Sequence, residues 1–185
     1  MEDCALFTDV SLNSGFKLGV GAYLAVPIAI LGVSPGSSEI SELSGQLVMK
    51  IFQGTSSTAL EVQTVLWALE DYRNGLRDSK AGRTRIYSDS QCIEGLLRRR
   101  RELEAHGFLG KRTGHEIKNA DLYRRFYELH DTLGFEIIKA AGHTRSITHD
   151  TVHRIFSEVD RKVRKTLRLM MREGKVGQKG KYSDR

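Results

Sequence analysis

The alternation of hydrophobic and polar residues predicts three strands near the start of the chain. Residues 5–9 form a short apolar run that ends in an acid, and residues 17–27 are rich in β-branched, aromatic and glycine residues. A turn near residues 13–15 joins these two segments, and residues 46–52 alternate loosely, as a third strand would. Residues 32–45 are rich in Ser and Gly, which predicts a loop or a hairpin connection.

The rest of the chain has mainly helical spacing. Apolar residues recur every three or four positions after a run of Ser and Thr, which predicts a helix over residues 60–72. The same pattern predicts helices over residues 91–105, 121–133 and 150–172. Short apolar segments at residues 83–88 and 135–140 predict two further strands, and residues 107–118 are irregular.

This order of elements favours a single α/β domain over residues 1–172, with a mixed five-stranded sheet and helices on both faces. No internal repeat and no second core is visible in the sequence. Residues 173–185 combine Gly, Lys and Ser, so they are predicted to form a basic, disordered tail.

Composition excludes several classes of protein. Hydrophobic residues make up 39% and charged residues 28%, which is too apolar for disorder throughout and too polar for a membrane protein. The longest apolar stretch, residues 19–31, is interrupted by Pro27 and is too short to span a bilayer. The two cysteines form no disulfide framework and fit a reducing compartment. We therefore expect a cytoplasmic monomer that does not enter a membrane.

Positive charge is concentrated in two places. The net charge is +6, and residues 161–185 hold ten Lys and Arg against two acids. Residues 97–125 hold nine Lys and Arg against four acids. Such zones attract polyanions, of which nucleic acid is the commonest in the cytosol, although a solvated helix face is the alternative for any run of charges.

Four acids lie where the backbone is predicted to change character: Asp9, Glu61, Asp89 and Asp160. Taken alone, each has a structural explanation. Asp9 suits a turn, Glu61 a capping box, Asp89 a helix N-cap, and Asp160 an ion pair with an arginine four positions later. Taken together, they can converge at one edge of the sheet, where carboxylate oxygens suit a hard cation such as Mg²⁺. Two such ions about 4 Å apart can promote cleavage of a phosphodiester.

Five segments of the chain carry a resemblance to a known family. In order, they are Phe7-Thr8-Asp9-Val10-Ser11, Glu61 with Trp67-Ala68-Leu69-Glu70, Ile86-Tyr87-Ser88-Asp89-Ser90-Gln91, Asn119-Ala120-Asp121-Leu122-Tyr123, and Ala141-Gly142-His143. Over about residues 6–167 the chain resembles the type 1 ribonuclease H family. The third segment is the most specific, because a strand that ends in Asp-Ser-Gln before a helix is a hallmark of that family.

The resemblance implies a ribonuclease H-like fold and a metal-dependent endoribonuclease that hydrolyses the RNA strand of RNA/DNA hybrids by a two-metal-ion mechanism. It implies that Asp9, Glu61, Asp89 and Asp160 are catalytic and bind Mg²⁺, with Mn²⁺ as an alternative, and that His143 is a mobile histidine near the scissile phosphate. The residues expected to contact nucleic acid are Ser57, Thr58, Gln91, Arg98, Arg99, Arg100, Arg101, Lys111, Arg112 and Lys118.

The sequence departs from the family in its substrate-facing positions. Val10 replaces the usual Gly after the first Asp, and Ser57 and Thr58 stand where two Asn residues are often found. These changes leave open a nuclease of the same fold that acts on another nucleic acid. A catalytically silent nucleic-acid-binding module is a third hypothesis, which the complete set of acids disfavours.

The interval between the Gly-His motif and the last acid is also long. It contains His149 and His153, either of which could replace His143 as the working histidine, and Asp150, which competes with Asp160 for the fourth carboxylate. Asp160 is favoured because the apolar residues around it have helical spacing, which places it next to the core.

Overall fold

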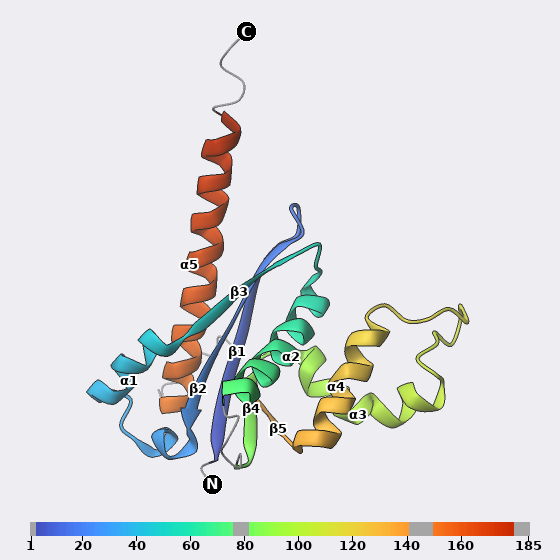
Figure 1. The fold of residues 1–185 in the computed structure, drawn as a ribbon, viewed down its shortest axis with the longest axis horizontal. Helices are drawn as coiled ribbons and strands as arrows, with labels where there is room; N and C mark the ends of the chain where they lie inside the picture. The colour runs from blue at the N-terminus through green and yellow to red at the C-terminus, as the bar shows by residue number, and fades with distance from the viewer. Residues whose placement is uncertain (1–2, 76–81, 141–149, 180–185) are drawn as a thin grey trace.

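One mixed β-sheet organises the chain (Figure 1). The computed structural model describes residues 3–75, 82–140 and 150–179. The strand order is β3-β2-β1-β4-β5; the first three strands are antiparallel neighbours, and β4 is parallel to both β1 and β5. The strands are β1 (Cys4–Asn13), β2 (Leu18–Pro27), β3 (Val48–Gln53), β4 (Thr84–Ser88) and β5 (Glu136–Lys139).

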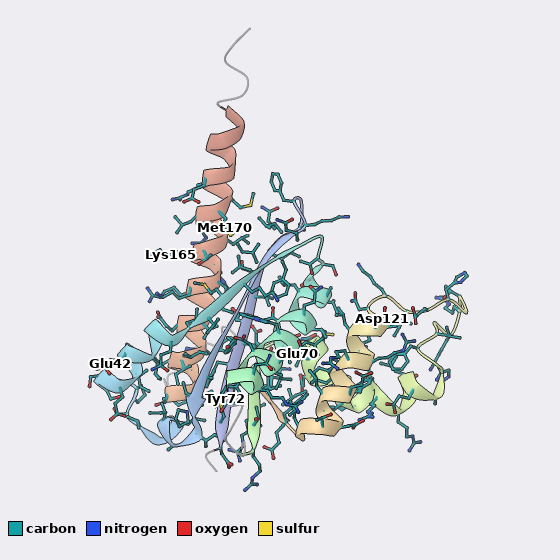
Figure 2. All side chains as sticks on the ribbon, in the orientation of Figure 1. Glu42, Glu70, Tyr72, Asp121, Lys165 and Met170 are labelled. Carbon is teal, nitrogen blue, oxygen red and sulfur yellow. The ribbon has the colours of Figure 1, made fainter. Side chains whose placement is uncertain are left out.

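Helices cover both faces of this sheet, as the sequence predicts. The longer helices are α2 (Ser57–Gly75), α3 (Gln91–Ala105), α4 (Ala120–Leu133) and α5 (Thr151–Lys179). Helix α5 packs on β1 and β2, whereas α2 covers the opposite face with α3 and α4 beside it (Figure 1). Arg125 of α4 donates to Glu70 of α2 at 2.9 Å, which links these two helices at the surface; Glu70 is labelled in Figure 2.

Alternation along β1 produces two separate hydrophobic clusters. Leu6 is fully buried on the side of α2, α3 and α4, together with Ile86 of β4. Its neighbours Ala5 and Phe7 point to the other side, where they pack with residues of α5 such as Val159. Both faces of the sheet centre are therefore buried, which explains the uninterrupted apolar run at the start of β1, from Cys4 to Phe7.

The segment between β2 and β3 differs from the loop predicted for residues 32–45. It contains the 3₁₀ helix η1 (Ile28–Gly32), the short helix α1 (Ser38–Leu43) and the 3₁₀ turn η2 (Ser44–Gln46). Ile40 and Leu43, three positions apart, are both buried against the α5 side of the core. Burial of these two side chains stabilises a helical turn that the Ser- and Gly-rich composition conceals.

Two other predicted boundaries are wrong. Strand β1 does not end at Asp9 but continues to Asn13, because it pairs with β2 along its whole length, from Cys4–Pro27 to Asn13–Leu18. Helix α5 continues to Lys179, beyond the helix end predicted at residue 172. Extending an existing helix costs little compared with starting one, which accounts for this continuation.

Strand β3 lies at the edge of the sheet and is mostly exposed. Met49 and Ile51 are 43% and 51% exposed, and Lys50 lies between them along the strand. The Lys50 ammonium lies 5.6 Å from the ring centroids of Phe52 and Trp67. The edge of the sheet thus presents apolar side chains and one cation.

No helix in the described part of the chain combines the length and the apolar character needed to cross a lipid bilayer.

Close packing of α2 on β2 depends on Gly21. A Cβ atom at this position would collide with the side chain of Thr64, which is buried and, as a β-branched residue, cannot move aside easily. We therefore expect Gly21→Ala to force α2 away from the sheet, at a cost of about 1–3 kcal/mol typical of overpacking, and to lower the melting temperature by several degrees.

Thermal unfolding followed by circular dichroism measures this effect. Gly36→Ala is the matched control, because no atom lies within 4 Å of a Cβ built there. Equal melting temperatures for the two variants would contradict the packing argument.

Candidate functional site

Two of the predicted acids occupy equivalent positions on neighbouring strands. The last registered pair between the parallel strands β1 and β4 is Phe7 with Tyr87, whose rings stack at 4.6 Å between centroids. Asp9 and Asp89 each lie two residues beyond this pair, Asp9 inside β1 and Asp89 directly after β4. Side chains two residues apart share a face of a strand, so Asp9 projects on the same side as Phe7, toward α5.

Helix α5 brings a third acid to the same place. Asp160 follows the buried Val159 and precedes Val163, which faces the sheet one turn later. Asp160 lies within reach of a hydrogen bond donated by the protonated Asp9 carboxyl, and both Asp160 and Asp89 act on Asp9 as like charges. Asp9, Asp89 and Asp160 therefore meet at the rim of the sheet; we call these three residues the acidic rim.

Asp9 is the most perturbed member of the acidic rim. Burial first, and the nearby charges of Asp89 and Asp160 second, raise its pKa from an ordinary 3.8 to about 8, against an opposing hydrogen bond from the Val10 backbone. One of its oxygens, Oδ2, is buried and accepts no hydrogen bond from any residue that the structure describes. A buried carboxylate oxygen of this kind is costly to ionise unless a cation or a proton accompanies it.

Glu61 lies close by but has a partner of its own. The Ser90 hydroxyl donates to Glu61 Oε2 at 2.7 Å and also accepts from the Ile93 backbone, as the N-cap of α3. This hydrogen bond joins α2 to the start of α3, directly after Asp89. Glu61 is thereby held beside the acidic rim.

Three of the simple structural roles considered for these acids are not observed. Asp9 is in a strand rather than a turn, and the N-cap of α3 is Ser90 rather than Asp89. Helix α2 begins at Ser57, so Glu61 lies beyond its first turn and makes no capping box. The fourth role is present, because Arg164 pairs with Asp160 at 2.6 Å.

The donor set suits a hard divalent cation, since it consists of carboxylate oxygens and includes the unpartnered Asp9 Oδ2. The acids are not preassembled as a cage, however. Within residues 3–75, 82–140 and 150–179, no three His, Cys, Asp or Glu side chains are already close enough together to hold one ion. Carboxylates repel one another, and two of these acids have other partners: Glu61 is bonded to Ser90 and Asp160 to Arg164.

Of the three histidines considered for a catalytic role, the structure describes one, His153. His143 and His149 lie outside the described residues. His153 is two helical turns before Asp160 on α5, about 10 Å along the axis, and lines a hollow of about 720 Å³ between α5 and α1. Asp150 accepts from the His153 backbone at 2.8 Å and so caps α5, whereas Asp160 is the residue beside Asp9.

The predicted basic contacts divide into two groups. Arg100 is paired with Glu104 and Asp131, and Lys111 with Glu102, so their charges are compensated within the protein. The other five are exposed: Arg98, Arg99, Arg101, Arg112 and Lys118. The run of four arginines is therefore a cationic surface only in part.

The polar candidates lie at helix starts. Ser57, exposed, and Thr58, half-buried, open α2, and Gln91, exposed, opens α3. Gln91 also lines a hollow of about 550 Å³ with Lys139, a residue that the sequence reasoning missed. Lys139 ends β5 and lies beside Ser88 in the parallel register. Its place at the carboxyl end of a predicted strand is the sequence feature that could have identified it as a candidate.

Comparison with known proteins identifies the fold without a sequence family. No protein-family model and no curated protein matches the chain. A matching solved structure is the crystal structure of LC9-RNase H1, described as a type 1 RNase H with the type 2 active-site motif, at a TM-score of 0.55 and 18% identity. The match covers 77% of this chain and 64% of that one, so this chain spans less than two thirds of its length. This likeness shows the fold: the chain has a ribonuclease H-like α/β fold.

The raised pKa of Asp9 predicts a pH-dependent stability. Between about pH 4 and pH 8 the folded state holds a proton that the unfolded state releases, so in the absence of metal Asp9 makes the fold less stable as pH rises through this window. Asp9→Asn removes this loss of folding stability, because asparagine does not ionise. We expect the variant to melt several degrees above wild type at pH 9 in chelator, and no higher than wild type near pH 4.

Calorimetry at a series of pH values measures the difference. A difference in melting temperature that stays constant from pH 4 to pH 9 would contradict the assignment of Asp9 as a buried, proton-holding carboxyl.

Proposed function

We propose that this chain is a metal-dependent endoribonuclease that hydrolyses the RNA strand of RNA/DNA hybrids and leaves 3′-hydroxyl and 5′-phosphate ends. The observation that supports this most is the acidic rim, in which Asp89 and Asp160 lie near enough to Asp9 to raise its pKa. The ribonuclease H-like fold of the chain agrees with the proposal.

Asp9 and Asp89 would hold the principal cation, with Glu61 orienting it and Asp160 completing a second position. When bound, Mg²⁺ lowers the pKa of a coordinated water and stabilises the leaving oxygen. In the overall reaction, water adds to phosphorus, the bond to the 3′ oxygen breaks, and that oxygen takes a proton. For Asp9 to act as a ligand, it must first lose the proton that burial favours.

Two neighbouring residues position these acids. Ser90 donates to one oxygen of Glu61 and leaves the other available to the cation or to a ribose 2′-hydroxyl. Arg164 holds Asp160 at the rim, one helical turn away on the same face of α5. His143, on the segment before α5, is proposed to assist turnover by moving a proton or releasing product.

Recognition of the hybrid would combine two kinds of contact. Exposed arginines and lysines of α3 and of the segment after it would contact phosphates without regard to sequence. Gln91 opens α3 two residues after Asp89, and Ser57 and Thr58 open α2 one turn before Glu61. We expect these three residues to meet the minor groove. The 2′-hydroxyls exposed there distinguish RNA from DNA.

Removing either central carboxylate tests the mechanism. We expect Asp9→Asn and Asp89→Asn to nearly abolish Mg²⁺-dependent cleavage of a labelled hybrid, because the cation loses a principal ligand. Binding of the hybrid in chelator should be unchanged or slightly tighter, since one negative charge near phosphate is removed.

Asp121→Asn is the matched control. Asp121, labelled on α4 in Figure 2, has a side chain that is 92% exposed and pairs with Arg124 rather than with the rim. Cleavage at the wild-type rate by both rim variants would refute the proposal.

The substrate is tested by competition. We expect cleavage of an RNA/DNA hybrid to exceed cleavage of double-stranded RNA and double-stranded DNA of the same sequence by at least tenfold. The reason is that the proposed enzyme needs 2′-hydroxyls on the strand that is cut and a strand without them opposite it. Initial rates in Mg²⁺, in Mn²⁺ and in chelator give the comparison. Preference for another duplex would instead support a different nuclease, in line with Val10, Ser57 and Thr58; binding without any cleavage would support a silent binding module.

A further inference from the structure

A cationic hollow lies near the acidic rim, and the nucleic-acid contacts proposed above do not yet assign it a particular phosphate of the hybrid. It is formed by the first two turns of α3 and the end of β5, has a volume of about 550 Å³, and is lined by Gln91, Glu94, Gly95, Arg98, Arg99 and Lys139. We propose that this hollow is a binding subsite for one phosphate of the strand that is cut. The inference rests on the proposed function for the identity of that strand.

The charges in the hollow favour an anion. Three cations face one acid, and the acid, Glu94, is already paired with Lys139 at 2.8 Å. Arg98 and Arg99 have no carboxylate within ion-pair distance among the residues that the structure describes, unlike Arg100 on the same helix. Arg99 donates through Nε to the Gly95 carbonyl at 3.3 Å and through Nη2 to Cys92 Sγ at 4.0 Å, so the Arg98 guanidinium and Arg99 Nη1 are the groups left for a ligand. Guanidinium binds phosphate oxygens in a planar, two-point geometry.

Gly95 opens the floor of the hollow. It lies inside α3, where glycine costs about 1 kcal/mol relative to alanine, and it is buried. A Cβ atom at this position would meet only Arg99 Nε at 3.6 Å and Arg98 Nη2 at 4.0 Å. The helix could thus accommodate alanine, and the space that glycine leaves lies directly beside the guanidinium groups of Arg98 and Arg99.

The hollow lies within reach of a strand that is cut at the rim. Lys139 lies beside Ser88 in the β4–β5 register, and Asp89 of the acidic rim follows Ser88. From Gln91, two residues after Asp89, the lining extends to Arg98, about 10 Å along α3. At a rise of about 3.4 Å per nucleotide, this length corresponds to about three nucleotides, so the strand cut at the rim can place a neighbouring phosphate in the hollow.

Binding of a 12-base-pair hybrid in chelator, followed by fluorescence anisotropy over a range of salt concentrations, tests the charges. We expect Arg98→Gln with Arg99→Gln to weaken binding about tenfold and to reduce the slope of log Kd against log salt by about 0.7–0.9 per lost contact. Glu94→Gln should tighten binding several-fold. Arg83→Gln, an exposed arginine at the opposite end of β4, is the matched control and should bind as wild type does.

Gly95→Ala separates binding from folding. It should raise the melting temperature, because alanine favours the helix, and at the same time weaken hybrid binding by twofold to tenfold. A variant that is more stable and binds as tightly as wild type would overturn the proposal.

A neutral linkage locates the phosphate. Single methylphosphonates are placed along either strand of a hybrid whose only ribonucleotides are a central block of four, which fixes the cleavage site. In the wild type, a methylphosphonate at one linkage of the cut strand, within three nucleotides of that site, should cause most of the loss of affinity. In the Arg98→Gln, Arg99→Gln variant, a methylphosphonate at that linkage should cause no further loss of affinity. Sensitivity only in the DNA strand would overturn the proposal.

The two proposals fail separately. If the wild type binds with this pattern but cuts no hybrid in Mg²⁺, the subsite stands and the nuclease function fails. If it cuts hybrid while the arginine variants show unchanged affinity and salt dependence, the nuclease function stands and the subsite is refuted.

Discussion

The parallel pairing of β1 with β4 is the constraint on which the rest of the site depends. Because Phe7 pairs with Tyr87, Asp9 and Asp89 reach the rim side by side. A shift of one residue in this register would turn Asp9 toward α2 and separate it from Asp160. The stacked rings that secure the register are also part of the surface on which α5 packs, so one set of contacts positions three acids from three distant parts of the chain.

The site is built against an electrostatic cost. Asp9 is half-buried beside two like charges, and burial together with these charges raises its pKa. Residues with no role in the chemistry hold the surroundings in place, namely Ser90 at Glu61 and Arg164 at Asp160. The hydrophobic clusters on both faces of the sheet supply the stability that tolerates such strain.

Local patterns predicted much of this fold, and long-range contacts explain what they missed. Helix α3 spans 91–105 in the structure, as its periodicity predicts, although its N-cap is Ser90 and not the predicted Asp89. The short helix α1 was not predicted, because Ser and Gly dominate the segment around it while two buried apolar side chains decide its structure. The sequence also did not predict that, within the described ranges, Arg100 is ion-paired while Arg98 is not, since Asp131, the partner of Arg100, lies 31 residues away in the sequence.

The exposed edge strand β3 carries a consequence for behaviour in solution. An open sheet edge with apolar side chains is a template for association between molecules, and proteins commonly guard such edges with lysine. Lys50 is the only charged residue of β3, and aromatic rings hold its ammonium near the strand. Protection against edge-to-edge aggregation therefore depends on one cation in this strand, and concentrated salt, which screens that charge, would weaken it.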